Sequence, residues 1–154
     1  MRIAISADHG GYSLKTVLID YIRELGFDLM DLGTDSEESV DYPDFAQKVG
    51  RAIQENEAER GIIICGSGVG ACISANKMIG IYAAVCHDTY SAGQGVEHDD
   101  MNVLCLGGRI VGSELAKMIV KSFLEAEFSG YESGNERHLR RVEKTKEIEK
   151  EELS

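Results

Sequence analysis

The feature that most constrains the fold is an alternation of short apolar runs with segments whose apolar residues recur every three or four positions. The third run, residues 61–65, is apolar on both faces, which is typical of a central strand in a parallel sheet. We therefore expect an α/β fold, a Rossmann-like three-layer α/β/α sandwich around a five-stranded, mostly parallel sheet. The expected strands cover residues 3–7, 27–32, 61–65, 81–86 and 102–106.

Helical spacing follows each expected strand. Pro43 suits the first turn of a helix, and Ser113 is expected to cap another. Gly93 and Gly95 make one segment less regular, since each costs roughly 1 kcal/mol in a helix interior. The expected helices cover residues 12–25, a segment from Pro43, 69–77, 89–97, 113 to about 128, and a charged tail from about 136. The prediction is a single domain over residues 1–154, with a C-terminal helical arm from about 135.

The charge of the chain limits its partners. It has 154 residues, with 16 Lys plus Arg against 27 Asp plus Glu, so its formal charge is −11. This balance argues against nucleic acid and against an anionic membrane surface, because both are recognised through clustered cations. No run approaches the roughly 20 apolar residues of a membrane span. A small anionic ligand needs only a local basic pocket and stays compatible.

The four cysteines indicate a reducing environment. Cys65, Cys72, Cys86 and Cys105 form no C-x-x-C pair, and the chain is large enough to fold without disulfides. The N-terminal apolar stretch is too short for a signal peptide. We expect free thiols and a cytoplasmic protein.

The strongest local motif is Cys65-Gly-Ser-Gly-Val-Gly70, which follows the third strand and enters a helix. Ligands of parallel α/β sheets bind beyond the carboxyl ends of the strands, where this motif lies. Its glycines let backbone N–H groups turn toward an anion, and a cysteine in such a place ionises readily. The Ser67 hydroxyl can donate to the same charge. The alternative is a glycine-rich turn with a structural cysteine.

Two other interpretations of this motif are weaker. Gly66-x-Gly68-x-x-Ala71 fits the dinucleotide fingerprint, but it follows the third strand instead of the first, and no second domain is present to hold a substrate. A cysteine-dependent phosphatase needs an arginine to close its anion loop, and residues 65–72 contain none.

Asp8 and His9 follow the first strand, where an acid and an imidazole can shuttle protons or hold a phosphate. Asp8 can equally cap the next helix. His98 lies in an acidic segment before the fifth strand, and by itself it fits an exposed loop residue better than a catalyst. The same applies to His87 and His138.

Arg137 and Arg141 belong to the densest cationic cluster of the chain. Four residues apart on a helix, they share one face, from which two guanidiniums can grip a phosphate. The alternative is a solvated, salt-bridged helix, which the alternating charges after residue 143 also fit.

Taken in order along nearly the whole chain, the motifs resemble the ribose-5-phosphate isomerase type B family, which also includes the galactose-6-phosphate isomerase subunits. The segments that carry the resemblance are I-A-I-S-A-D-H-G-G at 3–11, D-L-G-T at 31–34, S-V-D-Y-P-D at 39–44, G-I-I-I-C-G-S-G-V-G at 61–70, A-N-K at 75–77, N-V-L at 102–104, G-G-R-I-V-G at 107–112 and R-H-L-R-R at 137–141.

The resemblance implies an aldose–ketose isomerase of the pentose phosphate pathway that interconverts ribose 5-phosphate and ribulose 5-phosphate through an enediolate, without metal or cofactor. It implies that Cys65 is the base, that Ser67 helps to stabilise the enediolate and that His98 opens the sugar ring. It also implies a homo-oligomer, dimer or tetramer, whose sites are built from two chains. The other implied substrate-contacting residues are Asp8, His9, Tyr42, Gly66, Gly68, Val69, Gly70, Arg109, Arg137 and Arg141.

Several positions depart from the family pattern. Asp99 stands where an Asn is usual, and we expect it to contact the sugar. Tyr82 replaces a usual Arg, and residues 129–136 form a longer approach to Arg137. Ala71 occupies the position of the carboxylate base in a second branch, so the chain resembles the thiolate branch. A six-carbon substrate (allose or galactose 6-phosphate) and a non-catalytic sugar-phosphate or nucleotide-binding module stay open as alternatives.

Overall fold

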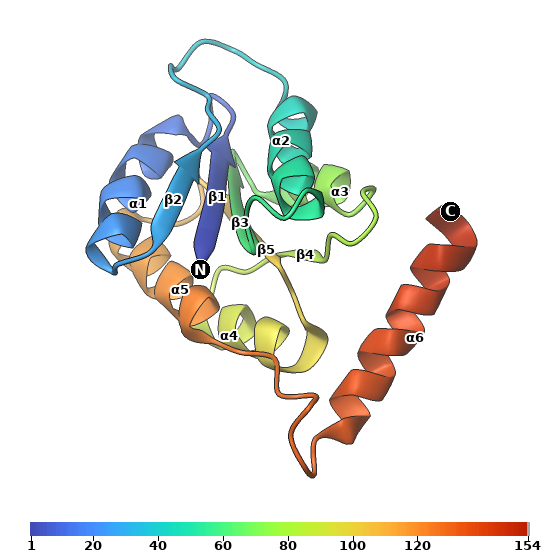
Figure 1. The fold of residues 1–154 in the computed structure, drawn as a ribbon. Coiled ribbons are helices and arrows are strands. Elements are labelled where there is room, and N and C mark those ends of the chain that lie inside the picture. Colours follow the sequence, from blue (N-terminus) through green and yellow to red (C-terminus); the bar gives the residue numbers. More distant parts are fainter. Residues whose placement is uncertain (154) are drawn as a thin grey trace.

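The computed structural model describes residues 1–153 and contains one five-stranded sheet, which is parallel throughout, in the order β2-β1-β3-β5-β4 (Figure 1). The predicted α/β sandwich is confirmed, with a fully parallel sheet. In chain order the elements are β1 (Arg2–Ala7), α1 (Tyr12–Glu24), β2 (Asp28–Asp31), α2 (Tyr42–Gln54), β3 (Arg60–Cys65), α3 (Val69–Ala75), β4 (Ala83–Val85), α4 (Thr89–Asp99), β5 (Val103–Gly107), α5 (Ser113–Glu125) and α6 (Glu136–Leu153).

Helices cover both faces of the sheet. Helices α1, α4 and α5 pack on one face, and α2 and α3 pack on the other (Figure 1). The central strand β3 feeds both layers, because successive side chains of a strand point to opposite faces. Ile62 and Ile64 belong to the first core, whereas Ile63 and Cys65 belong to the second. Cys65 therefore points toward α2 and α3.

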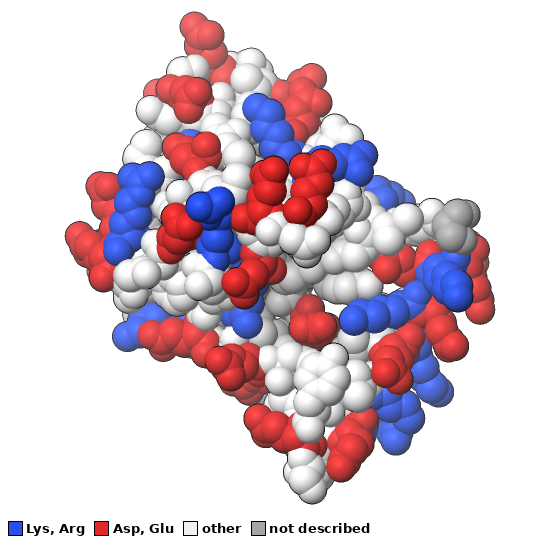
Figure 2. Space-filling view, viewed as in Figure 1, with Lys and Arg blue, Asp and Glu red and all other residues white. Residues whose placement is uncertain are grey.

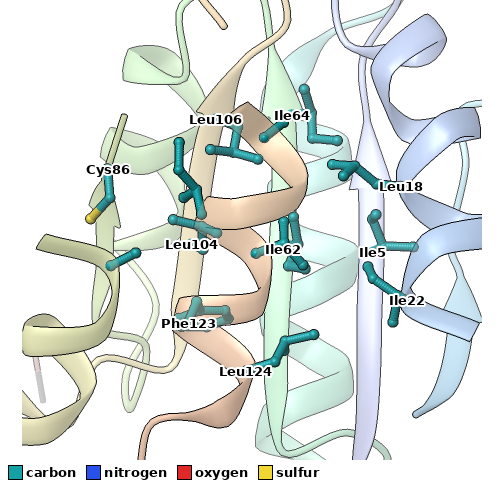
Figure 3. Packing of buried hydrophobic residues seen from close by; sticks show 14 of the residues in the cluster. Ile5, Leu18, Ile22, Ile62, Ile64, Cys86, Leu104, Leu106, Phe123 and Leu124 are labelled. Carbon is teal, nitrogen blue, oxygen red and sulfur yellow. The ribbon is translucent and has the colours of Figure 1, made fainter. Parts of the chain in front are cut away.

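The first core is the larger. Figure 3 shows side chains of α1 and α5 closing on the isoleucines and leucines of the strands. Leu18, Leu104 and Phe123 are fully buried there. This packing holds the central strands in place, so the loops at their ends start from fixed points.

Two predicted helix details were wrong. Ser113 is the first residue of α5, not its cap: the cap position is Gly112, and no side chain caps the helix. Helix α5 ends at Glu125, short of residue 128, because Ala126 adopts an extended conformation. Arg60 binds the carbonyl oxygens at this end, at 2.7 Å from Phe123 and 2.6 Å from Ala126. These bonds satisfy acceptors that a helix end leaves unpaired.

Helix α4 is regular despite its two glycines. A Cβ at Gly93 would lie 2.8 Å from the Ser122 hydroxyl, and one at Gly95 would lie 3.1 Å from the Met101 sulfur. The glycines thus allow α4 to pack closely against its neighbours, and this packing offsets their low helix propensity.

Helix α6 stands beside the β4 edge, away from the sandwich (Figure 1). It buries only His138 and Val142. Near its C-terminal end, Glu149 accepts hydrogen bonds from the Gly80 N–H at 2.9 Å and the Tyr82 hydroxyl at 2.8 Å. Burial and this carboxylate raise the pKa of Tyr82, so its hydroxyl stays a donor. The Arg-to-Tyr departure at 82 therefore forms a contact with the arm.

Acidic and basic side chains intermix on the face seen in Figure 2, including α6. None of the helices in residues 1–153 is long and apolar enough to cross a bilayer.

Candidate active site

The loops that follow β1, β3 and β5 meet at the carboxyl edge of the sheet. Main-chain hydrogen bonds join them: the Asp8 N–H donates to the Ile64 carbonyl oxygen at 3.1 Å, and the Gly108 N–H donates to that of Cys65 at 2.7 Å. The Arg109 N–H continues the series to Gly66 at 3.1 Å. The Cys65 loop is therefore held on both sides by backbone.

Glycines make this approach possible. A Cβ at Gly11 would overlap the Ile64 carbonyl group, and one at Gly108 would lie 2.5 Å from the Gly10 oxygen. Real Cβ atoms do not approach backbone so closely, so the three loops pack this tightly only with glycine at these positions.

The Cys65 sulfur lies inside this arrangement. Its residue is 4% exposed, and its Sγ accepts a hydrogen bond from the Gly68 N–H at 3.1 Å. Gly68 has φ +82°, a left-handed conformation that glycine adopts without strain. The exposed Ser67 hydroxyl lies 3.2 Å from the Val69 nitrogen and accepts its N–H. The loop thus directs a backbone donor at a sulfur that can carry negative charge.

Asp8 organises the first loop from the inside. The buried carboxylate accepts from the Gly10 N–H at 2.8 Å and from the Gly11 N–H at 3.2 Å. It closes the turn before α1, but the cap position of that helix is Gly11, which has no side-chain cap. His9 is half-buried, and its Nδ1 accepts the Val40 N–H at 3.2 Å. This bond leaves the proton of a neutral ring on Nε2.

Tyr42 and Arg109 complete the rim. A Cβ at Gly70 would lie 2.7 Å from the Tyr42 ring, so the ring lies over the start of α3. The Arg109 guanidinium lies 3.5 Å from the Cβ position of Gly66. An arginine therefore does approach the cysteine loop, although it comes from the end of β5 and not from the loop sequence.

His98, Asp99, Arg137 and Arg141 form a second group. Helix α4 starts after the carboxyl end of β4 and returns to the amino end of β5, so His98 in its last turn lies at the opposite edge of the sheet from Cys65. The five residues of β5 separate these edges by roughly 15 Å. Within one chain the structure brings together the residues at the carboxyl edge, which are Cys65, Asp8, His9, Tyr42 and Arg109. It does not bring the second group to them.

Two residues of the second group, Asp99 and Arg141, help to line a groove of about 520 Å³ between β4 and α6. His98 is half-buried, and its ring stacks on that of His138 with centroids 3.9 Å apart. Arg137 is exposed and donates to the Gly134 carbonyl oxygen at 2.9 Å.

Two histidines interpreted as exposed loop residues have structural partners. His138 is 5% exposed, and the half-buried His87 accepts the Gly107 N–H at its Nε2, at 2.9 Å. The strand-end position of His87 was the one signal that pointed to it. For His138 the signal was its place between two arginines at the start of a predicted helix.

The predicted free thiols are confirmed for all four cysteines. A hydrogen bond from the Cys105 thiol lowers the pKa of the Cys72 thiol to about 7, against a smaller opposing effect of burial. Burial raises the pKa of Cys86 to about 11. No group of His, Cys, Asp and Glu in the described part of the chain is arranged to hold a metal ion.

Comparison with known proteins identifies the family. The Ribose/Galactose Isomerase family model matches residues 3–145. The chain belongs to this family. It is 47% identical over 148 residues to ribose-5-phosphate isomerase B of Escherichia coli, a match that covers 96% of each protein. It is also 44% identical over 131 residues to D-erythrulose-4-phosphate isomerase of Pectobacterium atrosepticum, which covers 84% of this chain and 86% of that one.

Solved structures of the ribose/galactose isomerase family share the fold. A structure of ribose-5-phosphate isomerase B from Clostridium thermocellum superposes with a TM-score of 0.92 at 50% identity, covering 98% of this chain and 99% of that one. The predicted family resemblance is confirmed. Membership also favours isomerase chemistry over the dinucleotide-binding and non-catalytic interpretations of the Cys65 loop.

Proposed function

We propose that this isomerase interconverts ribose 5-phosphate and ribulose 5-phosphate in the cytoplasm, without a metal or cofactor. The observation that carries the proposal is the Cys65 sulfur under the Gly68 N–H, in a loop fixed by backbone on both sides. The name of the Escherichia coli relative, at 47% identity, supports the same substrate pair.

In the proposed mechanism the Cys65 thiolate removes the proton from C2 of the open-chain aldose. The electron pair of that C–H bond forms the C1–C2 double bond, and the carbonyl O1 becomes an oxyanion. N–H groups of the 66–70 loop and the Ser67 hydroxyl stabilise this charge, because donors fixed in advance need no reorganisation during the step. The thiol then returns the proton to C1, and the O2–H proton moves to O1 as O2 becomes the carbonyl, which gives the ketose.

We further propose that the complete site contains two chains. Asp8, His9, Tyr42 and Arg109 lie at the carboxyl edge with the base, and His9 and Arg109 are the phosphate ligands of that chain. The ring opener His98 and the phosphate-binding pair Arg137 and Arg141 then come from a second copy. The opposite placement of the two groups within one chain supports this assignment.

Mixed oligomers test base and shared site together. Cys65→Ala and His98→Ala are each purified alone and are then prepared together by co-expression with two different tags. Each single variant should lose turnover of ribose 5-phosphate. In a symmetric dimer, half of a random mixture is hybrid, and each hybrid keeps one intact site, so the mixture should recover about a quarter of wild-type activity.

Three outcomes oppose the proposal. Substantial turnover by Cys65→Ala alone would remove the proposed base. An inactive mixture that contains hybrid, shown by tandem-tag purification, would place the site within one chain. Wild-type protein that does not isomerise ribose 5-phosphate would overturn the substrate.

A second candidate is another sugar length. The family model is named for galactose as well as ribose, and the Pectobacterium relative is named for a four-carbon ketose phosphate. Values of kcat/KM for the four-carbon, five-carbon and six-carbon sugar phosphates separate these substrates, and Asp99→Asn tests whether the acidic side chain sets the preference.

A further inference from the structure

The imidazole ring of His98 is covered by a second imidazole. His98 lies in the last turn of α4 and His138 in the first turn of α6, and their rings stack with centroids 3.9 Å apart and planes inclined by 10°. His138 is almost entirely buried. The stack therefore fixes the tilt of the His98 ring from one face.

The edge of the His98 ring is held as well. The side-chain nitrogen of Gln94, one turn earlier on α4, lies 3.1 Å from His98 Nδ1. This contact occupies Nδ1, whichever of the two groups donates, and leaves the other ring nitrogen free. Nε2 is then the nitrogen that exchanges a proton with a ligand.

Hydrogen bonds to main-chain carbonyl oxygens hold together the two helix ends that carry the rings. The Glu97 carbonyl oxygen, next to His98, accepts from the Ser129 N–H at 3.0 Å and from the Ser129 hydroxyl at 2.9 Å. The His138 N–H donates to the Asn135 carbonyl oxygen at 3.0 Å. The long 129–136 segment thus ties the end of α4 to the start of α6, where the stack forms.

The surroundings of His138 disfavour its charged form. Burial lowers its pKa most, and the nearby His98, Arg137 and Arg141 lower it further, whereas Asp99 opposes the shift. A neutral ring can face an imidazolium without repulsion, whereas two charged imidazoles at this separation would destabilise each other.

We propose that His138 is a positioning residue, which holds the His98 ring in place by stacking and stays neutral when His98 takes up a proton. The inference rests on the proposed role of His98 in ring opening. In that step the bond from C1 to the ring oxygen breaks and its electron pair goes to that oxygen. The O1–H electrons form the carbonyl, and His98 accepts the O1 proton and delivers one to the ring oxygen. No oxidant or reductant is needed.

Two substitutions separate stacking from proton chemistry. His138→Phe keeps a flat ring that does not titrate, and its kcat for ribose 5-phosphate should stay within about 3-fold of wild type. His138→Ala removes the stack, and its kcat should fall about 10- to 100-fold with KM changed less than 2-fold, as misplacement of a reacting group predicts. Arg140→Ala, an exposed residue of the same helix, is the matched control and should leave both constants unchanged.

A second measurement uses ribulose 5-phosphate, the ketose of the substrate pair, which stays in the open-chain form. Ribulose 5-phosphate cannot close a furanose ring because its O5 is esterified, so exchange of its C1 hydrogen in deuterated water requires the base but no ring opening. His138→Ala should exchange this hydrogen at the wild-type rate, whereas Cys65→Ala should not exchange it. If kcat of His138→Ala equals that of wild type, if His138→Phe loses as much as His138→Ala, or if C1 exchange falls together with kcat, the proposal is wrong.

Failure of the substrate assignment gives a different result. Wild-type protein that neither turns over ribose 5-phosphate nor exchanges ribulose 5-phosphate overturns the proposed function and this inference with it. Should His138→Ala fail to fold, histidine nitrogen NMR of the wild type decides the charge state. The His138 ring should stay neutral below the ordinary histidine pKa of about 6.5, and titration at the ordinary value would contradict the proposal.

Discussion

The carboxyl edge of the sheet and helix α6 are attached to the molecule in different ways. At the carboxyl edge, main-chain hydrogen bonds join the loops, and the loops leave no room for a side chain at Gly11 and Gly108. Helix α6 buries two residues and depends on side-chain contacts, chiefly Glu149 at one end and the stacked His138 at the other. The carboxyl edge has almost no room for an added atom, whereas the position of α6 depends on a few side-chain contacts.

The difference between the two regions indicates which groups are held rigidly and which are held more loosely. A base that removes a carbon-bound proton must be held closely, and backbone packing fixes the loop that carries it. Groups that grip a phosphate, such as the α6 arginines, can arrive on an element with weaker attachment. We therefore expect substitutions at the edge to affect stability and substitutions on α6 to affect substrate use.

The largest effect should come from Gly11→Ala. Its methyl group would overlap the Ile64 carbonyl and force β1 and β3 apart, so unfolding free energy should fall by about 3 kcal/mol or more. Thermal and urea unfolding measure this. Gly112→Ser, where an added Cβ meets nothing within 4 Å, is the control and should change stability by less than about 0.5 kcal/mol. Equal stability of both variants would show that the edge is not tightly packed.

A smaller loss is expected for Lys15→Met. The Lys15 side chain is 2% exposed and its ammonium lies 2.6 Å from Asp31, which also accepts the Gly33 N–H at 3.0 Å. Removing the cation leaves a partly buried carboxylate unpaired, so unfolding free energy should drop by about 2–3 kcal/mol. Lys117→Met breaks the exposed pair with Glu114 and should cost less than about 0.5 kcal/mol. Similar losses in urea unfolding would argue that burial of Lys15 is irrelevant.

For α6 we expect an effect on binding. Arg141→Ala should raise KM for the sugar phosphate about 10- to 100-fold, the range for one charged hydrogen bond, with little change in melting temperature. Lys144→Ala, three residues along the same helix, should leave KM unchanged. If steady-state kinetics give equal KM values for the two variants, the arginine cluster is a solvated face of the helix.

Glu149→Gln should loosen the arm by about 1 kcal/mol, because a neutral amide replaces a charged acceptor for Gly80 and Tyr82. Amide hydrogen exchange should speed up in the second half of α6 and stay unchanged in β3. The exposed Glu151→Gln should alter neither region. Faster exchange spread over the sheet would contradict the separation of the two regions.

The smallest effect concerns Cys72, which lies beside the edge on α3. With a pKa of about 7, its thiolate fraction should rise as pH increases through 7, and iodoacetamide should label it with that midpoint. Cys86 and Cys105 have raised pKa values and should react slowly below pH 9. The lowered pKa also means that this thiolate stabilises the fold at alkaline pH and loses that contribution as pH falls through 7. Mass spectrometry of labelled peptides checks the order.

Much of the edge is visible in the sequence because its requirements are local. The apolar run at 61–65 specifies a central strand, and the glycines after it specify a tight loop. Arg109 follows the fifth expected strand in the sequence. Its approach to Gly66 depends on the pairing of β5 with β3, and the order of strands in the sheet cannot be read from the sequence.

The second group was harder to predict. The histidines 98 and 138 are 40 residues apart in number, and nothing in either segment announces a stack. The sequence order predicts His98 just before the fifth strand, but only the path of α4 puts it at the amino edge. The C-terminal end of α5 and the regularity of α4 likewise depend on tertiary partners, Arg60 and Ser122, which outweigh local preference.

The contact between Gly108 and the backbone of Gly10 affects how this protein can vary. A selection that asks only for folded protein, run on a Cys65→Ala background without catalysis, should still reject amino-acid substitutions at Gly108. The requirement for glycine at this edge is therefore steric before it is chemical. The same selection can be run on an active background that must also catalyse the reaction. Positions that tolerate substitution in the inactive background but not in the active one are those that catalysis requires.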